Sequence, residues 1–182
     1  ALRQYREARA REVLDTPVLG FLETTALVSR MMGRSFSVIT PTDKFALSFS
    51  QKLKLYGLEQ RLASIEAMNF QHLSDFREVW VDASARQRVS DEFDRVARRA
   101  VAAGAEVIIP CGSHAVLQAQ RGLREIDGAL IMDGLAVLMK MTEMAVKTHK
   151  IMGTFVSRKL LYQAPDKVTR ERAKKDYGID LS

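Results

Sequence analysis

The chain has 182 residues, of which 47% are hydrophobic and 27% are charged, and it contains one cysteine. This length and composition indicate a globular protein with one sizeable core, and the chain is too short for two full domains to be expected. The sequence lacks a run of about 18 apolar residues, its charged N-terminal stretch is unlike a signal peptide, and one cysteine cannot form an internal disulfide. We therefore expect a cytoplasmic protein without membrane contacts.

The net charge of +6 is concentrated near the C-terminus. Seven Lys and Arg residues and two acidic residues lie between Arg158 and Lys175, so this segment carries +5 of that charge. Only Tyr162 and Tyr177 are interleaved with these charges, which is too few for a surface that stacks single-stranded bases. We interpret 151–182 as a basic C-terminal tail and expect no nucleic-acid partner, although such a tail can also recruit an acidic partner.

Amphipathic helical patterns that end at a glycine recur along the chain, and short β-branched or apolar runs follow them. The expected strands are Val18–Leu19, Ser35–Ile39, Leu62–Ala67, Glu106–Ile109 and Ala129–Met132. Because helical patterns separate most of these strands, the predicted fold class is α/β, with a parallel sheet flanked by helices.

Two further helices are expected in the second half of the chain. The first covers about Ser74 to Ala103, with a break or kink at Val81–Asp82. The second begins near Leu135, and its spacing predicts a core-facing stripe of Leu135, Leu138, Met139, Thr142, Val146 and His149. The methionines in this stripe indicate packing rather than a cofactor site.

Ligands of parallel α/β sheets bind at the carboxyl ends of the strands, where the strand-to-helix loops gather. The candidate loops are therefore Glu23–Thr25, Thr40–Asp43, Pro110–His114 and Asp133–Gly134. The last of these is followed by a helix N-terminus that is available to an anion.

Cys111 is the residue in these loops with the clearest potential for chemistry. It directly follows a predicted strand and precedes Gly112, Ser113 and a helix, so backbone N–H groups and the helix dipole are expected to lower the pKa of its thiol. Gly112 lets the backbone approach a ligand, and Ser113 either caps the helix or donates to a carboxylate. Burial as a small hydrophobic residue is the alternative for Cys111. His114 is either a partly buried helix-start residue or a contact of the substrate or thiol.

Other site chemistries are not indicated. His72, His114 and His149 lack the spacing of metal ligands, and there is no second cysteine to complete a zinc site. The sequence contains neither a GxGxxG nor a GxxxxGK[ST] motif, so no dinucleotide or P-loop site is predicted.

Five segments of the chain resemble the aspartate/glutamate/hydantoin racemase superfamily, in particular its hydantoin racemase-like branch. They occur in the family order and include GRSFSVITPTDKF, AGAEVIIPCGS and IMDGLAVLMKMTEMAV, besides residues 10–29 and 56–68. The resemblance implies two α/β lobes with the active site between them. It also implies an isomerase that needs no cofactor or metal and acts on a small molecule, a hydantoin-like compound or small carboxylate.

In this family one cysteine from each lobe faces the substrate. One thiolate removes the proton α to a carbonyl, and the other thiol returns a proton to the opposite face. The resemblance assigns Cys111 to the second-lobe cysteine. It assigns substrate binding to Thr40, whose loop continues through Pro41 and Thr42, and to the backbone of Gly112 and Ser113. His114 is added as a candidate substrate contact because of its place beside Cys111.

A first-lobe cysteine is expected just upstream of ALRQYREA, where this chain begins. We therefore expect that an N-terminal part of the fold is missing. The chain would then comprise the remainder of the first lobe (1–20), the second lobe (21–132), a helix returning to the first lobe (133–150) and the basic tail (151–182). The alternative is a single-cysteine member, like the arylmalonate decarboxylase-like enzymes, which protonate one face.

Two rival functions remain at this stage. One is a decarboxylase or cis-trans isomerase of the same fold that uses Cys111 alone. The other is a non-catalytic binding protein in which Cys111 only packs and the basic tail recruits a partner. A two-lobed fold with an extended tail also favours a homo-oligomer.

Overall fold

The computed structural model describes residues 6–68, 70 and 75–178. The chain divides into two compact units, of which one is Phe21–Leu138 and the other combines Ala1–Gly20 with Met139–Ser182. Ser74 and His72, which the sequence analysis named, lie outside the described residues.

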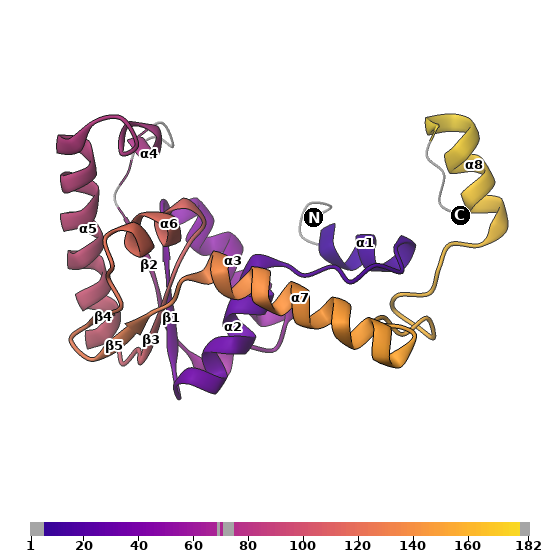
Figure 1. Cartoon of the computed structure of the whole chain (residues 1–182), viewed down its shortest axis with the longest axis horizontal. Helices are drawn as coiled ribbons and strands as arrows, with labels where there is room; N and C mark the ends of the chain where they lie inside the picture. The colour runs from indigo at the N-terminus through magenta and orange to yellow at the C-terminus, as the bar shows by residue number, and fades with distance from the viewer. Residues whose placement is uncertain (1–5, 69, 71–74, 179–182) are drawn as a thin grey trace. The chain divides into compact units, whose positions relative to one another are not determined.

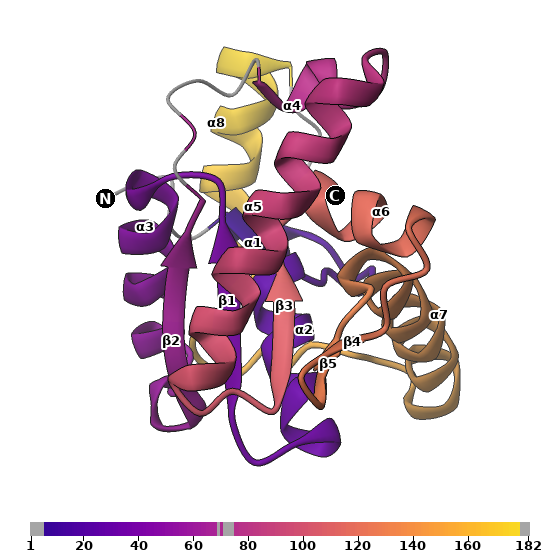
Figure 2. The same ribbon diagram turned by 90° about the vertical axis from the view of Figure 1, so that its left-hand side faces the viewer.

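The larger unit is built on a five-stranded sheet with the order β2-β1-β3-β5-β4. The strands β2, β1, β3 and β5 are parallel, and β4 is antiparallel to β5. Figure 2 shows the sheet with α5 crossing its near face. The bounds are β1 Phe36–Thr40, β2 Leu62–Ala67, β3 Val107–Pro110, β4 Glu125–Ile126 and β5 Ala129–Ile131. The predicted parallel α/β fold is confirmed.

Alternation along the buried strands divides the core into two layers. Ile39 and Ile108 pack on one face of the sheet with Phe93 of α5. Val38 and Val107 pack on the other face with Leu53 of α3. Each central strand therefore contributes hydrophobic side chains to both layers, as expected for a sheet that helices cover on both sides.

The helices of this unit lie on both faces of the sheet, with α2 and α3 opposite α5 (Figure 1). A short α4 ends before α5 begins, and the Asp82 side chain caps α5 by accepting from the Ser84 N–H. The break predicted at Val81–Asp82 is thus confirmed. The helical segments are α2 Phe21–Met32, α3 Asp43–Leu55, the 3-10 helix η1 Glu59–Arg61, α4 Asp75–Glu78, α5 Ala83–Ala102 and α6 Ser113–Gln120.

Two predictions for the N-terminal part of this region are wrong. Val18–Leu19 is not a strand but irregular chain, and Glu23–Thr25 is not a loop but the first turn and a half of α2. A two-residue apolar run is too short to separate a strand from a connection by pattern alone. The α2 helix begins directly after Gly20, so Glu23–Thr25 does not follow a strand.

The smaller unit contains α1 (Arg6–Val13), most of α7 (Gly134–Met152) and α8 (Lys167–Tyr177). Arg158 closes the C-terminal end of α1. Its Nη1 donates to the carbonyls of Arg11 and Glu12 at 2.6 and 2.9 Å, and its Nη2 donates to Leu14 O at 2.7 Å. These bonds satisfy carbonyls that a helix end leaves without partners.

The stripe predicted on α7 is only partly correct. Ala145 is fully buried, whereas Met139 and Val146 are 66% and 38% exposed. The buried side of the helix follows Leu138, Thr142, Ala145 and His149, so it is rotated by about one residue from the predicted stripe. No helix in the described part of the chain is both long and apolar enough to cross a membrane.

Candidate active site

The loops that follow β1 and β3 lie side by side at the carboxyl edge of the sheet. Ile39 pairs with Pro110, and the next residue, Cys111, donates its N–H to Ile39 O at 2.9 Å. On the other side of β1, the Met68 N–H donates to Thr40 O at 2.8 Å. The sequence prediction that the loops at Thr40 and Cys111 meet at this edge is therefore confirmed.

Cys111 begins a tight turn between β3 and α6. The His114 N–H donates to Cys111 O at 3.2 Å, and Gly112 has φ 55° and ψ −122°. These angles are those of the first central residue of a type II′ turn, which strongly favours glycine. A Cβ on Gly112 would have no atom within 4 Å, so open space lies beside this residue. The sequence CGSH thus fixes where the thiol lies relative to α6.

Several helix N-termini converge at the same edge. The helices α3, α6 and α7 begin at Asp43, Ser113 and Gly134, each directly after a strand or its short loop. The start of α2 lies there too, because a Cβ on Gly134 would be only 2.8 Å from the Phe21 ring. The partial positive charge of helix N-termini favours anions, so this edge is suited to a carboxylate or a developing enolate.

The Thr40–Thr42 loop is held by its own hydrogen bonds. The Thr40 hydroxyl is buried and donates to Thr42 O at 3.2 Å. Pro41 is buried as well, and Thr42 precedes α3 without a side-chain capping bond. A hydroxyl carries one proton, and the Thr40 hydroxyl already donates it, so this group can only accept a further hydrogen bond. The Thr42 hydroxyl makes no capping bond to α3.

The pKa of Cys111 differs from the sequence expectation. Burial raises the pKa of this half-buried thiol to about 11, and the Lys52 ammonium on α3 opposes that shift. Removal of the thiolate from water outweighs the effect of the nearby positive groups. The expected lowering toward neutrality is therefore wrong for the structure described, and Cys111 is a protonated thiol at pH 7.

His114 is buried more deeply than a helix-start residue would be expected to be. It is 2% exposed, and its ring stacks on Phe70 with 6.4 Å between centroids. Burial lowers the pKa of His114 to about 4, so the imidazole is neutral at pH 7. The side chain thus forms a buried layer with Phe70, and its contact with a substrate remains a prediction.

The buried His114 should make the protein less stable in mild acid. Unfolding restores an ordinary pKa near 6.5, so the unfolded state takes up a proton as the pH falls from about 6.5 to 4. We expect the free energy of unfolding to drop by about 2 kcal/mol between pH 7 and pH 5 through this residue. Urea unfolding at both pH values would measure the drop.

Two variants test the assignment of this pH dependence. His114→Phe should lose most of it, while His149→Gln, which removes a histidine outside this layer, should retain it. An equal drop in the His114→Phe variant would show that another group is responsible.

Two neighbours of the site were not found from the sequence. Lys52 is nine residues beyond the start of α3, and Phe70 follows β2, so neither carries a local motif. Only the tertiary fold brings Lys52 near Cys111 and Phe70 against His114. Within the described residues, no group of three or more His, Cys, Asp and Glu side chains is arranged to hold a metal ion.

Comparison with known proteins connects this edge of the sheet with a family. The model of the Asp/Glu/hydantoin racemase family matches residues 7–142, which include both loops of the site. The chain belongs to the Asp/Glu/hydantoin racemase family. None of the curated protein sequences compared with this racemase-family chain matches it.

Two solved structures resemble the racemase-family chain over most of its length. Allantoin racemase from Klebsiella pneumoniae shares 24% identity with a TM-score of 0.69, and the match covers 88% of this chain and 61% of that one. Allantoin racemase from Pseudomonas fluorescens shares 25% identity with a TM-score of 0.68, with coverages of 87% and 63%. The racemase-family chain therefore spans less than two thirds of the length of these proteins.

Proposed function

We propose that this chain takes part in the racemisation or a related isomerisation of a small molecule by moving a proton at a carbon α to a carbonyl. Cys111 acts as one acid/base, without a cofactor. The observation that carries the proposal is the place of Cys111 at the end of β3, beside the end of β1, in a chain of the racemase family.

The chemistry follows from the properties of the thiol. A base on one face of the substrate takes the α-proton, and the electron pair moves into the carbonyl to form an enolate. Cys111, protonated at rest because its pKa is about 11, then gives its proton to the other face of that carbon. In the reverse direction the same sulfur, as thiolate, removes the proton. Helix N-termini at this edge support the negative charge on the enolate oxygen.

The similar structures support a first choice of substrate class. Because they are allantoin racemases, a hydantoin-like ring is the first class to test, followed by small carboxylates. In the ring, the carbon that exchanges its proton lies next to a carbonyl. The loop Thr40–Thr42, the backbone of Gly112 and Ser113, and His114 are proposed to bind the substrate.

A second candidate is suggested by the presence of one cysteine in the sequence. With Cys111 as the sole acid/base, proton transfer is confined to one face of the substrate, as in a decarboxylase or a cis-trans isomerase of the same fold. A binding protein without catalysis is the remaining alternative.

Deuterium exchange at the α-carbon separates these functions. A panel of hydantoins, including allantoin, is incubated with the protein in D2O, and both NMR and optical rotation are followed. Exchange with loss of rotation supports racemisation, whereas exchange with retained rotation supports one-sided proton transfer. Cys111→Ser should lower the exchange rate by about 100-fold or more.

Two controls make this result specific. The rate without protein is subtracted, and Ile109→Val, a conservative change two residues before Cys111 on β3, should leave the exchange rate unchanged. Undiminished exchange in a folded Cys111→Ser protein would contradict the role of the thiol. No exchange with any compound would favour the binding protein.

A further inference from the structure

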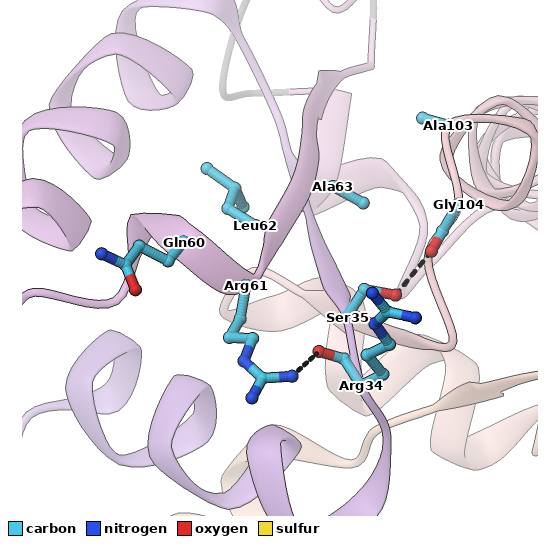
Figure 3. Close-up of a pocket in the computed structure, with 8 residues that line it drawn as sticks. All are labelled: Arg34, Ser35, Gln60, Arg61, Leu62, Ala63, Ala103 and Gly104. Atoms are coloured by element: carbon cyan, nitrogen blue, oxygen red, sulfur yellow. Dashed lines mark hydrogen bonds between the residues drawn. The ribbon is translucent and has the colours of Figure 1, made fainter.

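A pocket of about 590 Å³ opens at the amino edge of the sheet, opposite the edge that carries Cys111. The residues that line it include Ser35 just before β1, Leu62 and Ala63 at the start of β2, and Gly104 after the end of α5 (Figure 3). The pocket lies at the starts of β1 and β2, whereas the candidate active site lies at the ends of β1 and β3. The two sites are therefore at opposite edges of the sheet.

An irregularity in the sheet forms one wall of the pocket. Phe36 pairs with Leu62, but the next residue, Ser37, pairs with Ser64, so Ala63 is an extra residue in β2. The Ser64 N–H bonds to the Ser37 hydroxyl at 3.1 Å at this point. Such a bulge bends the strand locally, and bulges are common beside binding sites.

Two arginines contribute positive charge to this pocket. Arg61 Nη1 donates to Arg34 O at 3.2 Å, which holds one end of the Arg61 guanidinium, as Figure 3 shows. Arg34 is exposed and also lines the pocket. Among the described residues, neither guanidinium forms an ion pair with a carboxylate. Most of their N–H donors therefore remain available.

The negative groups nearby are engaged by the protein itself. Glu106 Oε2 accepts from the Arg34 backbone N–H at 2.7 Å, and Gly104 O, just past the end of α5, accepts from the Ser35 hydroxyl at 2.5 Å. These bonds occupy one lone pair of each oxygen, and neither group belongs to an acidic residue that lines the pocket. The residues that line the pocket include two arginines and no acidic residue, so the lining carries a net positive charge.

We propose that this pocket binds a small organic oxyanion, with its phosphate or carboxylate group on Arg34 and Arg61 and its organic part against Leu62 and Ala63. Guanidinium groups bind both kinds of oxyanion through paired N–H donors. A volume of about 590 Å³ is within the usual range for small-molecule sites. Since both arginines are solvent-exposed, the dissociation constant should be roughly 1 mM at low salt and should rise as salt is added.

Titrations of the ¹⁵N-labelled full chain with phenyl phosphate and with benzoate test the proposal. The amide signals of Ser35, Ala63 and Gly104 should shift in a saturable manner with at least one of the two compounds. Binding of phenyl phosphate alone assigns the site to phosphate esters, and binding of benzoate alone assigns it to carboxylates. No saturable shift with either compound at 20 mM, an amount chosen to be about 20-fold above the expected constant, would overturn the proposal.

Charge variants distinguish the pocket from general attraction to a basic protein. Arg34→Gln and Arg61→Gln together should weaken binding about 10-fold or more, whereas Arg77→Gln and Arg88→Gln together, an equal loss of charge at exposed positions of α4 and α5, should have little effect. Equal weakening by both changes would mean that the pocket is not the site. Arg61→Lys, which keeps the charge and removes the paired donors, should give an intermediate loss.

Discussion

Replacing Phe93 by alanine should lower the free energy of unfolding by about 3–5 kcal/mol. Phe93 is 0% exposed at the centre of α5, within the layer that also contains Ile39 and Ile108. Removal of the ring loses the free energy gained by burying it and leaves a cavity, which the neighbouring residues of the β-sheet cannot easily fill. Urea unfolding followed by the fluorescence of the single tryptophan, Trp80, would measure the loss.

A more conservative substitution checks the explanation. Phe93→Leu keeps most of the side-chain volume and should cost clearly less than Phe93→Ala. Gln87→Ala, at an exposed position of the same helix, should stay within about 0.5 kcal/mol of the parent protein. A loss below 1.5 kcal/mol, about half the expected minimum, in Phe93→Ala would mean that this layer is less tightly packed than the structure indicates.

Replacing Gly112 by alanine should impair both stability and catalysis. The backbone angles of Gly112, φ 55° and ψ −122°, are unfavourable for any residue with a Cβ, at a cost of about 1–3 kcal/mol. Relaxation of this strain would move Cys111 and the start of α6. Because a misplacement of about 1 Å can cost about 100-fold in rate, we expect a comparable fall in α-carbon exchange.

Gly57→Ala provides the matched control. Gly57 also has a positive φ of 66°, but it follows α3 and precedes β2, at the amino edge of the sheet. This variant should lose some stability and retain the exchange rate. If Gly112→Ala exchanged the α-proton as fast as the parent protein, the turn geometry would not be what positions the thiol.

The sequence predicted the parts of the site that depend on local patterns. The β-branched runs at Ser35–Ile39 and Glu106–Ile109 located β1 and β3 to within one residue, and the loops after them were expected at the same edge. The run Ala129–Met132 likewise located β5, but its hairpin partner β4 was missed, although Asp127–Gly128, both with positive φ, is a strong turn signal.

The remaining features depend on packing that local patterns do not reveal. The pKa of Cys111 rises because the neighbouring segments exclude water from the thiol, and no residue next to it in the sequence signals that burial. Lys52 reaches the thiol electrostatically only because α3 folds back along the sheet. Similarly, the buried side of α7 was misplaced because the small side chain of Ala145 contributes little to the hydrophobic periodicity although the residue is fully buried.

The position of β1 in the middle of the sheet bears on how the protein is made. β1 leaves the ribosome before both of its neighbours, β2 and β3, and pairs with them in parallel. The chain must therefore be synthesised as far as Pro110 before this strand has a partner on each side. Until then the edge that pairs with β3, and the face that α5 covers, are open to other nascent chains for longest. Helix α2, which precedes β1, and helix α3, which follows it, pack on the same face of the sheet, so they can cover that face of β1 before β3 is made.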